Sequence, residues 1–377
     1  MLARIARLTM TGTVITVGSP ANGTPGESGH SQPFSEGFGL AEPVDAAQAL
    51  LSEMKLPLSR TFYPLGYAVD IITNRERVLE AAAESFGHRR LCHGATALQV
   101  RIGISDKPGR KCPPEPVRRA YSHLFSLVAD ADNQALLDLS TCTSFAWLSR
   151  AALNNRLYFR CNFLEKIVYL LLGASVVTDL HAACVSWNGR GVLLCGGSGS
   201  GKSTLAYGCA RVGWTYTSDE TSYLINDSPV PRVIGHAHRV RFRPSARLLF
   251  PELASHELTS RLEGKPSIEV PLSELNISST ATEATPNFIV FLKRSAEGLG
   301  ALLPLARGSA TERLRRELYS TGDLRARQEQ ILEVFCDTPA YELQYSDLQQ
   351  GIRALEELVK RTSGQEHPQN SSAKSEI

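Results

Sequence analysis

Residues 196–203 read Gly-Gly-Ser-Gly-Ser-Gly-Lys-Ser and match the pattern G-x-x-x-x-G-K-[ST]. A short apolar run, residues 191–195, precedes this stretch, and residues 203–211 can continue as a helix. Strand, glycine-rich loop and helix form the context in which this pattern binds phosphate, because backbone N–H groups and the helix N-terminus then face the negative charge. The stretch therefore predicts a nucleotide-binding loop in an α/β fold.

The loop pattern also predicts which residues contact the nucleotide. Lys202 is expected to reach the β- and γ-phosphates, and the Ser203 hydroxyl is expected to bind Mg²⁺. The sequence thus indicates ATP and Mg²⁺ as cofactors. The expected nucleotide-binding residues are Gly196, Gly197, Ser198, Gly199, Ser200, Gly201, Lys202, Ser203 and Thr204.

Two acidic residues, Asp219 and Glu220, follow the next predicted strand, residues 214–217. Parallel strands end at the same edge of a sheet, so both carboxylates are expected near the γ-phosphate. Together with Ser203, they are the predicted metal ligands, and Asp219 is the predicted proton acceptor. An exposed acidic turn is the structural alternative, but the position at the end of the strand favours function.

Other candidates remain open at this point. His181 lies in a predicted strand, residues 176–187, and is interpreted either as a core residue or as a catalytic one. Arg239, Arg241 and Arg243 alternate with period two and would share one face of a strand. That face is either solvated, or it supplies one arginine that stabilises a transferring phosphate.

Composition sets limits on the remaining function classes. The chain of 377 residues is 42% hydrophobic and has a net charge of +2, which gives no bias towards nucleic acid. None of the 8 cysteines form a C-x-x-C pair, so free thiols in a reducing cytoplasm are expected. No apolar run reaches membrane-spanning length, and neither a membrane nor a nucleic acid is a predicted partner.

The chain divides by composition into four predicted parts. Residues 1–59 read as a flexible leader and 363–377 as a disordered tail, because both are rich in small polar residues. Residues 60–150 read as a small α+β module of unknown role, with a hairpin turn near 129–133. Residues 151–362 begin with a helix, 151–176, and contain the phosphate loop, preceded by a hairpin turn at 188–191.

The phosphate loop, the hairpin before it and the acidic pair together resemble HPr kinase/phosphorylase and related serine kinases. The matching residues are His181-Ala182-Ala183, residues 191–204 and Ser218-Asp219-Glu220. The resemblance implies a phosphoenolpyruvate-carboxykinase-like P-loop fold, in which His181, Lys202 and Asp219 are catalytic, and it implies a homo-oligomer. Glu220 stands where the family has a second aspartate, and the segments through which the family handles HPr have no counterpart.

The sequence thus favours a cytoplasmic, Mg-ATP-dependent kinase that transfers the γ-phosphoryl group to a hydroxyl, expected to be a serine, on a protein or small molecule. A nucleotide-binding regulatory module with little or no phosphoryl transfer is the alternative, and a motor or transporter ATPase fits less well. Neither the acceptor nor the role of residues 60–150 can be read from the sequence.

Overall fold

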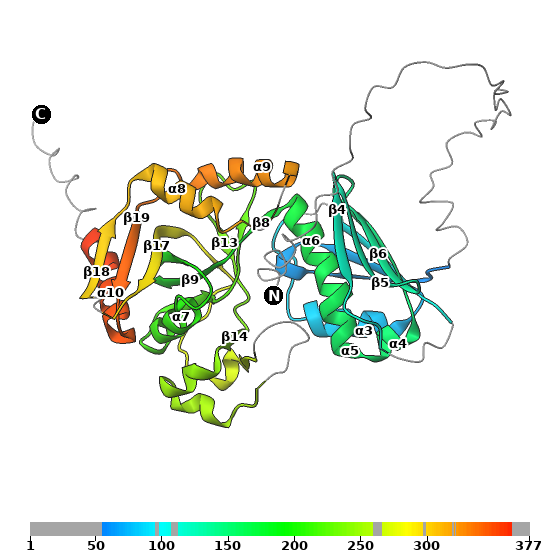
Figure 1. Ribbon diagram of the computed structural model, residues 1–377, viewed down its shortest axis with the longest axis horizontal. Coiled ribbons are helices and arrows are strands. Elements are labelled where there is room, and N and C mark those ends of the chain that lie inside the picture. The colour runs from blue at the N-terminus through cyan, green and yellow to red at the C-terminus, as the bar shows by residue number, and fades with distance from the viewer. Residues whose placement is uncertain are drawn as a thin grey trace, which may run out of the picture.

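The computed structural model describes residues 55–94, 98–106, 112–258, 266–296, 299–318, 320 and 322–363. Over these residues the protein is a mixed α/β structure (Figure 1). Most of the predicted leader and tail lies outside the described residues. The first strand, β1, includes Leu58 and Ser59, the last two residues of the predicted leader.

A seven-stranded sheet forms the N-terminal part. Its strands are β1 (Leu58–Phe62), β2 (Val69–Thr73), β3 (Leu98–Ile104), β4 (Val117–Tyr121), β5 (Leu124–Asp130), β6 (Asn133–Asp138) and β7 (Thr143–Leu148), in the order β1-β2-β3-β7-β6-β5-β4. The predicted hairpin near 129–133 is confirmed, since β5 and β6 pair antiparallel around it. Helix α3 (Glu76–Phe86) packs beside this sheet with Val78, Leu79 and Phe86 buried (Figure 1).

The helix predicted over residues 151–176 is present but broken. It consists of α4 (Arg150–Asn154), α5 (Arg156–Phe159), a π-helical turn η2 (Arg160–Leu164) and α6 (Glu165–Ser175). Asn155 interrupts the series because its side chain caps α5 by accepting from the Tyr158 N–H. Phe163, Ile167 and Leu171 face a core that also contains Tyr223 and Ile225 from the next part of the chain.

A six-stranded sheet carries the phosphate loop. Its strands are β9 (Ala182–Trp187), β10 (Arg190–Cys195), β11 (Thr215–Ser218), β17 (Pro286–Arg294), β18 (Leu299–Pro304) and β19 (Ala340–Tyr345), in the order β11-β9-β10-β17-β19-β18. The predicted turn before β10 is confirmed, with positive φ at Asn188 and Gly189. Central strands are apolar on both faces because helices cover both.

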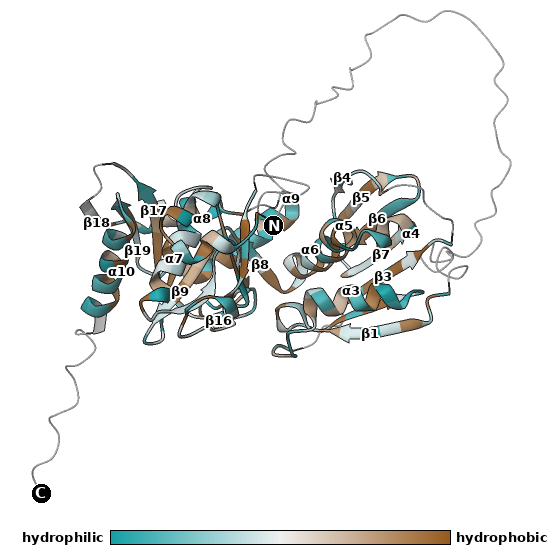
Figure 2. Cartoon of the chain, turned by 90° about the horizontal axis from the view of Figure 1, so that it is seen from below, coloured by the Kyte–Doolittle hydropathy of each residue, from teal (hydrophilic) through white to brown (hydrophobic). Residues whose placement is uncertain are grey.

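Helices α7 (Lys202–Arg211) and α10 (Leu348–Ser363) pack on one face of this sheet. Figure 2 shows the mixed hydropathy of α10, whose Ile352, Leu355 and Val359 are buried. Helix α8 (Arg307–Arg315) and the short helix η6 (Leu332–Phe335) cover the other face, and α9 (Gly322–Ile331) lies beside them (Figure 1). The remaining short helices are η1 (Pro64–Gly66), η3 (Pro244–Leu248), η4 (Pro251–Ser255) and η5 (Leu272–Glu274).

Two smaller sheets position the residues around the loop. One has the order β16 (Glu283–Ala284), β13 (Val233–Ile234), β12 (Ser222–Ile225) and β8 (Val177–Leu180), and the other pairs β14 (Arg239–Phe242) with β15 (Ile268–Pro271). The prediction of one continuous strand over residues 176–187 is wrong. The strand breaks at His181, because β8 pairs with β12 whereas β9 pairs with β10 and β11.

The segment from β11 to β12 breaks in the same way, at residues 219–221. Leu180 pairs with Ser222, and Cys184 pairs with Ser218, so the two breaks lie side by side. The change of sheet therefore brings His181 next to Asp219 and Glu220. Within the described residues, no helix is both long enough and apolar enough to span a membrane.

Candidate functional site

The glycine-rich loop links the end of β10 to the start of α7 in the predicted order. Gly196, Gly199 and Gly201 have φ values of 143°, 89° and 100°, a region of backbone conformation that favours glycine. A Cβ placed on Gly197 or Gly199 would meet nothing within 4 Å, so open space lies over this part of the loop. The loop and the first turn of α7, which contains Ser203 and Thr204, thus have the form of an anion cradle.

Tyr345, at the end of β19, supports the loop from the protein side. Its hydroxyl donates to the Ser200 carbonyl oxygen at 2.8 Å, and its side chain is buried. A Cβ on Gly201 would lie 2.4 Å from this hydroxyl oxygen, so the contact also requires glycine there. Sequence reasoning missed Tyr345, because nothing in the loop pattern points to a residue 144 positions after Gly201.

Lys202 is buried and folds back over the loop. Its Nζ donates to the carbonyl oxygens of Gly196 at 2.6 Å and of Gly197 at 3.2 Å. The same Nζ lies 3.0 Å from Nε2 of His181. The structure therefore brings together two of the three residues that the sequence analysis named as catalytic.

His181 is held in the gap between β8 and β9. Burial and the charge of Lys202 lower the pKa of the imidazole to about 4, so it is neutral at pH 7. A lysine ammonium has donors only, so Nε2 of His181 accepts and the ring proton resides on Nδ1. In this arrangement the ring positions the lysine and has no proton to give from Nε2.

Asp219 follows β11, as predicted, and reaches the loop by a different route from the expected one. Strands β10 and β11 run in the same direction but are separated by β9, to which both are antiparallel. Asp219 Oδ2 accepts from the Arg241 N–H at 2.8 Å, and its carbonyl oxygen lies 3.5 Å from Ser203 Oγ. Burial and the neighbouring charge of Glu220 raise the pKa of Asp219 to about 6.

Glu220 forms an ion pair with Arg241, whose Nη1 lies 2.7 Å from Glu220 Oε2. Burial alone would raise the pKa of Glu220, but the positive charge and the hydrogen bond of Arg241 help to lower it. Arg241 is thus the member of the arginine series that reaches the acidic pair. Arg243 approaches Ser198 in the loop at 3.5 Å, and Arg239 lies 3.5 Å from Glu269.

The donor set around the loop suits a hard cation. Ser203, Asp219 and Glu220 offer hydroxyl and carboxylate oxygens, which are the ligands that Mg²⁺ prefers. No group of three or more histidine, cysteine, aspartate or glutamate side chains in the described part of the chain has the geometry of a metal site. The site therefore fits a metal that is held partly by a nucleotide, and does not fit an all-protein metal centre.

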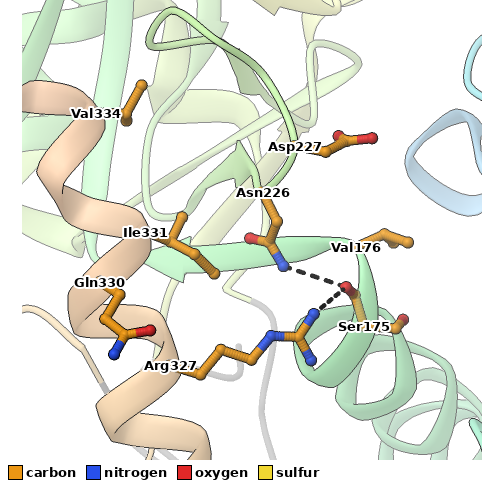
Figure 3. A pocket seen from close by; sticks show the side chains of 8 residues that line it. All are labelled: Ser175, Val176, Asn226, Asp227, Arg327, Gln330, Ile331 and Val334. Atoms are coloured by element: carbon orange, nitrogen blue, oxygen red, sulfur yellow. Dashed lines mark hydrogen bonds between the residues drawn. The ribbon is translucent and has the colours of Figure 1, made fainter.

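A separate pocket of about 550 Å³ lies away from the loop (Figure 3). It is lined by Ser175, Val176, Asn226, Asp227, Arg327, Gln330, Ile331 and Val334. The pocket lies at one end of β8 and β12, because Ser175 and Val176 precede β8 and Asn226 follows β12. His181 and Glu220 lie at the other end of these two strands. Arg327 and Asn226 donate to the Ser175 carbonyl oxygen and so satisfy the end of α6.

Comparisons with known proteins give little. No family model matches the chain, and no curated protein matches it. Among solved structures, the HPr(Ser) kinase/phosphatase from Coxiella burnetii aligns with 50% of this chain and 99% of that chain. The sequence identity is 12% and the TM-score is 0.29.

Proposed function

We propose that the protein is a Mg-ATP-dependent kinase that transfers the γ-phosphoryl group to a hydroxyl, expected to be a serine or a similar small hydroxyl. The observation that carries the proposal is that Lys202 of the loop contacts His181 while Ser203 Oγ of the same loop lies 3.5 Å from the Asp219 carbonyl oxygen. The pattern shared with HPr kinase/phosphorylase, His181, the loop and Asp219-Glu220, is the reason to expect a distant relationship and an analogous reaction.

The proposed roles follow from the geometry around the loop. The N–H groups of residues 196–204 would bind the phosphates, and Lys202 would leave the Gly196 carbonyl to contact the β- and γ-phosphates. Ser203 and Glu220 would hold Mg²⁺, which when bound neutralises phosphate charge, and the Asp219 carboxylate would remain to accept a proton. Neutral His181 would hold the Lys202 ammonium in line with the loop.

The transfer itself needs a proton acceptor for the attacking hydroxyl. The acceptor oxygen would form a bond to the γ-phosphorus while the bond from that phosphorus to the β–γ bridging oxygen breaks, and ADP leaves with this oxygen. The hydroxyl proton would pass to the Asp219 carboxylate. A pKa of about 6 makes this carboxylate more basic than an ordinary aspartate, yet it stays ionised at pH 7.

We also propose a role for each of the two predicted domains. Residues 151–362 would form the kinase domain, and the module at 60–150 would stand beside it. The ring contact between His88, which follows α3, and His238, which precedes β14, supports a role for this module in binding the acceptor.

The test is phosphoryl transfer from γ-labelled ATP to small hydroxyl compounds and to water, with the full chain and Mg²⁺. We expect Asp219→Asn to bind ATP as the wild type does but to transfer at least about 100-fold more slowly. Asp227→Asn is the matched control, because this exposed carboxylate lies at the far end of β12. Full turnover in Asp219→Asn would refute the assigned role.

The same experiment distinguishes the kinase from the second candidate function, a nucleotide-binding regulatory module. Arg241 contacts Glu220, and Lys202 donates to loop carbonyl oxygens. A nucleotide-binding regulatory module would bind Mg-ATP and open these contacts without transfer. Tight ATP binding by the wild type with no labelled product from any hydroxyl probe would favour that module over the kinase.

A further inference from the structure

A cluster of basic and imidazole side chains lies between β14 and the N-terminal sheet, next to the catalytic carboxylates. The rings of His88, which follows α3, and His238, which precedes β14, are 4.3 Å apart. Arg239 Nε donates to His238 Nε2 at 3.2 Å, and Arg89 donates to the Gly235 carbonyl oxygen. The ring of His236 also lies 5.6 Å from that of Tyr169 on α6.

One member of the cluster, Arg239, lies on β14, the strand that also carries Arg241. Residues two apart on a strand share a face and are separated by roughly 7 Å. Arg239 is therefore one such step from Arg241, whose guanidinium contacts Glu220. The Arg239 side chain is 47% exposed, whereas Arg241 is 18% exposed, so Arg239 presents the accessible charge beside the acidic pair.

The charge of this surface favours an anion. Burial, and then the charges of Arg89 and Arg239, lower the pKa of the His88 imidazole. Burial, with the nearby His88 and Arg239, lowers the pKa of His238 to about 3. The lowered pKa values favour the neutral form of both imidazoles, and a neutral imidazole can add hydrogen bonds without repelling a cationic neighbour. Glu269, 3.5 Å from Arg239, is the carboxylate that this guanidinium contacts among the described residues.

We propose that the phosphoryl acceptor carries an anionic group, a carboxylate or a phosphate, which Arg239 binds with His88 and His238 while the hydroxyl faces Asp219. This inference rests on the proposed kinase function. Arg239 and Arg241 are two residues apart on β14, and the Arg241 N–H contacts Asp219 Oδ2, so we expect the anionic group and the hydroxyl to belong to one small acceptor group. The N-terminal module contributes His88, which gives it a part in acceptor recognition.

Binding of matched probe pairs to the full chain tests the proposal. N-acetylserine and N-acetylserinamide differ only in the carboxylate, and glycerol 3-phosphate and glycerol differ only in the phosphate. The probes are titrated with the phosphate loop filled by Mg²⁺ and a non-hydrolysable ATP analogue, following the Arg239 Nε–Hε resonance in the arginine-labelled protein. We expect one anionic probe to bind about tenfold more tightly than its neutral partner.

Variants separate recognition from folding. Arg239→Gln should remove the preference for the anionic probe and leave the affinity for the ATP analogue unchanged. Arg316→Gln, at the exposed position that directly follows α8, is the control and should keep the preference. Equal binding within both pairs, no binding of any probe, or an undiminished preference in Arg239→Gln would overturn the inference.

The two proposals fail in different ways. Selective binding of an anionic probe through Arg239 without labelled product from ATP would support the anion site and count against the kinase. Transfer to neutral and anionic probes at equal rates would support the kinase and refute the anion site. The carboxylate and phosphate arms show which of the two anions the surface accepts.

Discussion

Nε2 of His181 accepts a hydrogen bond from the Lys202 ammonium at 3.0 Å, although 21 residues separate the two along the chain. The contact exists because the segment carrying His181 changes from one sheet to another at this residue. Lys202 is therefore anchored at a break in the strands that lies beside the break carrying Asp219 and Glu220. The two neighbouring breaks bring the residues of the proposed site together.

The pH dependence of transfer should show one acid limb that belongs to Asp219. The carboxylate form accepts the proton, so the rate should rise with pH through about 6 and level above it. His181 stays neutral across this range, because its pKa is lowered to about 4. A pH–rate profile of His181→Asn should keep the limb at lower overall rate. Loss of the limb in that variant would assign it to the histidine instead.

Asp219 should also cost stability at neutral pH. Its pKa is near 6 in the folded protein and near 3.8 in the unfolded chain. Folding is therefore opposed increasingly as pH rises from about 4 to 6, and the penalty is fully present above 6. A shift of about two units corresponds to at most about 3 kcal/mol.

We therefore expect Asp219→Asn to have a higher free energy of unfolding than the wild type at pH 7.5 and a similar one near pH 4. Urea denaturation at the two pH values measures the difference, with Asp227→Asn as the control for removing one exposed carboxylate. The contribution of Glu220 has the opposite sign, since its lowered pKa means that its stabilisation is lost as pH falls. An Asp219→Asn variant less stable at pH 7.5 than at pH 4, relative to wild type, would contradict the account.

Gly201 and Tyr345 should be coupled. Gly201→Ala places a Cβ 2.4 Å from the Tyr345 hydroxyl and keeps a φ of 100°, so ATP binding should fall at least tenfold. Tyr345→Phe removes the hydroxyl and one hydrogen bond. This single variant should lose about 1 kcal/mol of ATP-binding free energy. In the double variant the close contact is absent and only the backbone strain remains. The loss of ATP-binding free energy in the double variant, measured by calorimetry, should thus be smaller than the sum of the two single losses. A loss equal to that sum would show that the two residues act independently.

The ion pair between Arg241 and Glu220 should be measurable by a double-mutant cycle. Both side chains are mostly buried, and Nη1 and Oε2 are 2.7 Å apart. Arg241→Gln and Glu220→Gln should each destabilise the protein, and their coupling free energy should be about 1–2 kcal/mol. The Arg241 N–H bond to Asp219 is retained in the variant, so the cycle reports the side chains alone. A coupling energy near zero would mean that the pair does not persist in solution.

The sequence predicted the parts of this site that depend on consecutive residues. The strand, loop and helix around 191–211 follow from the eight-residue pattern and its flanks, and the acidic pair follows from its place after the next strand. The break at His181 could not be predicted, because it depends on which distant strands pair with β8 and β9. Arg241 could not be chosen over Arg239 and Arg243 for the same reason, since alternation gives all three the same face.

Titration with Mg-ATP is the most direct test of the central claim, that the 196–204 loop is a working nucleotide site. Ligand that binds only the native state raises the melting temperature, by an amount equivalent to about 2.7 kcal/mol at a hundredfold excess over Kd. We predict a saturable shift for the wild type and a weakening of affinity by about 1.5–3 kcal/mol in Lys202→Ala. No shift for the wild type, or the same shift in Lys202→Ala, would contradict the account.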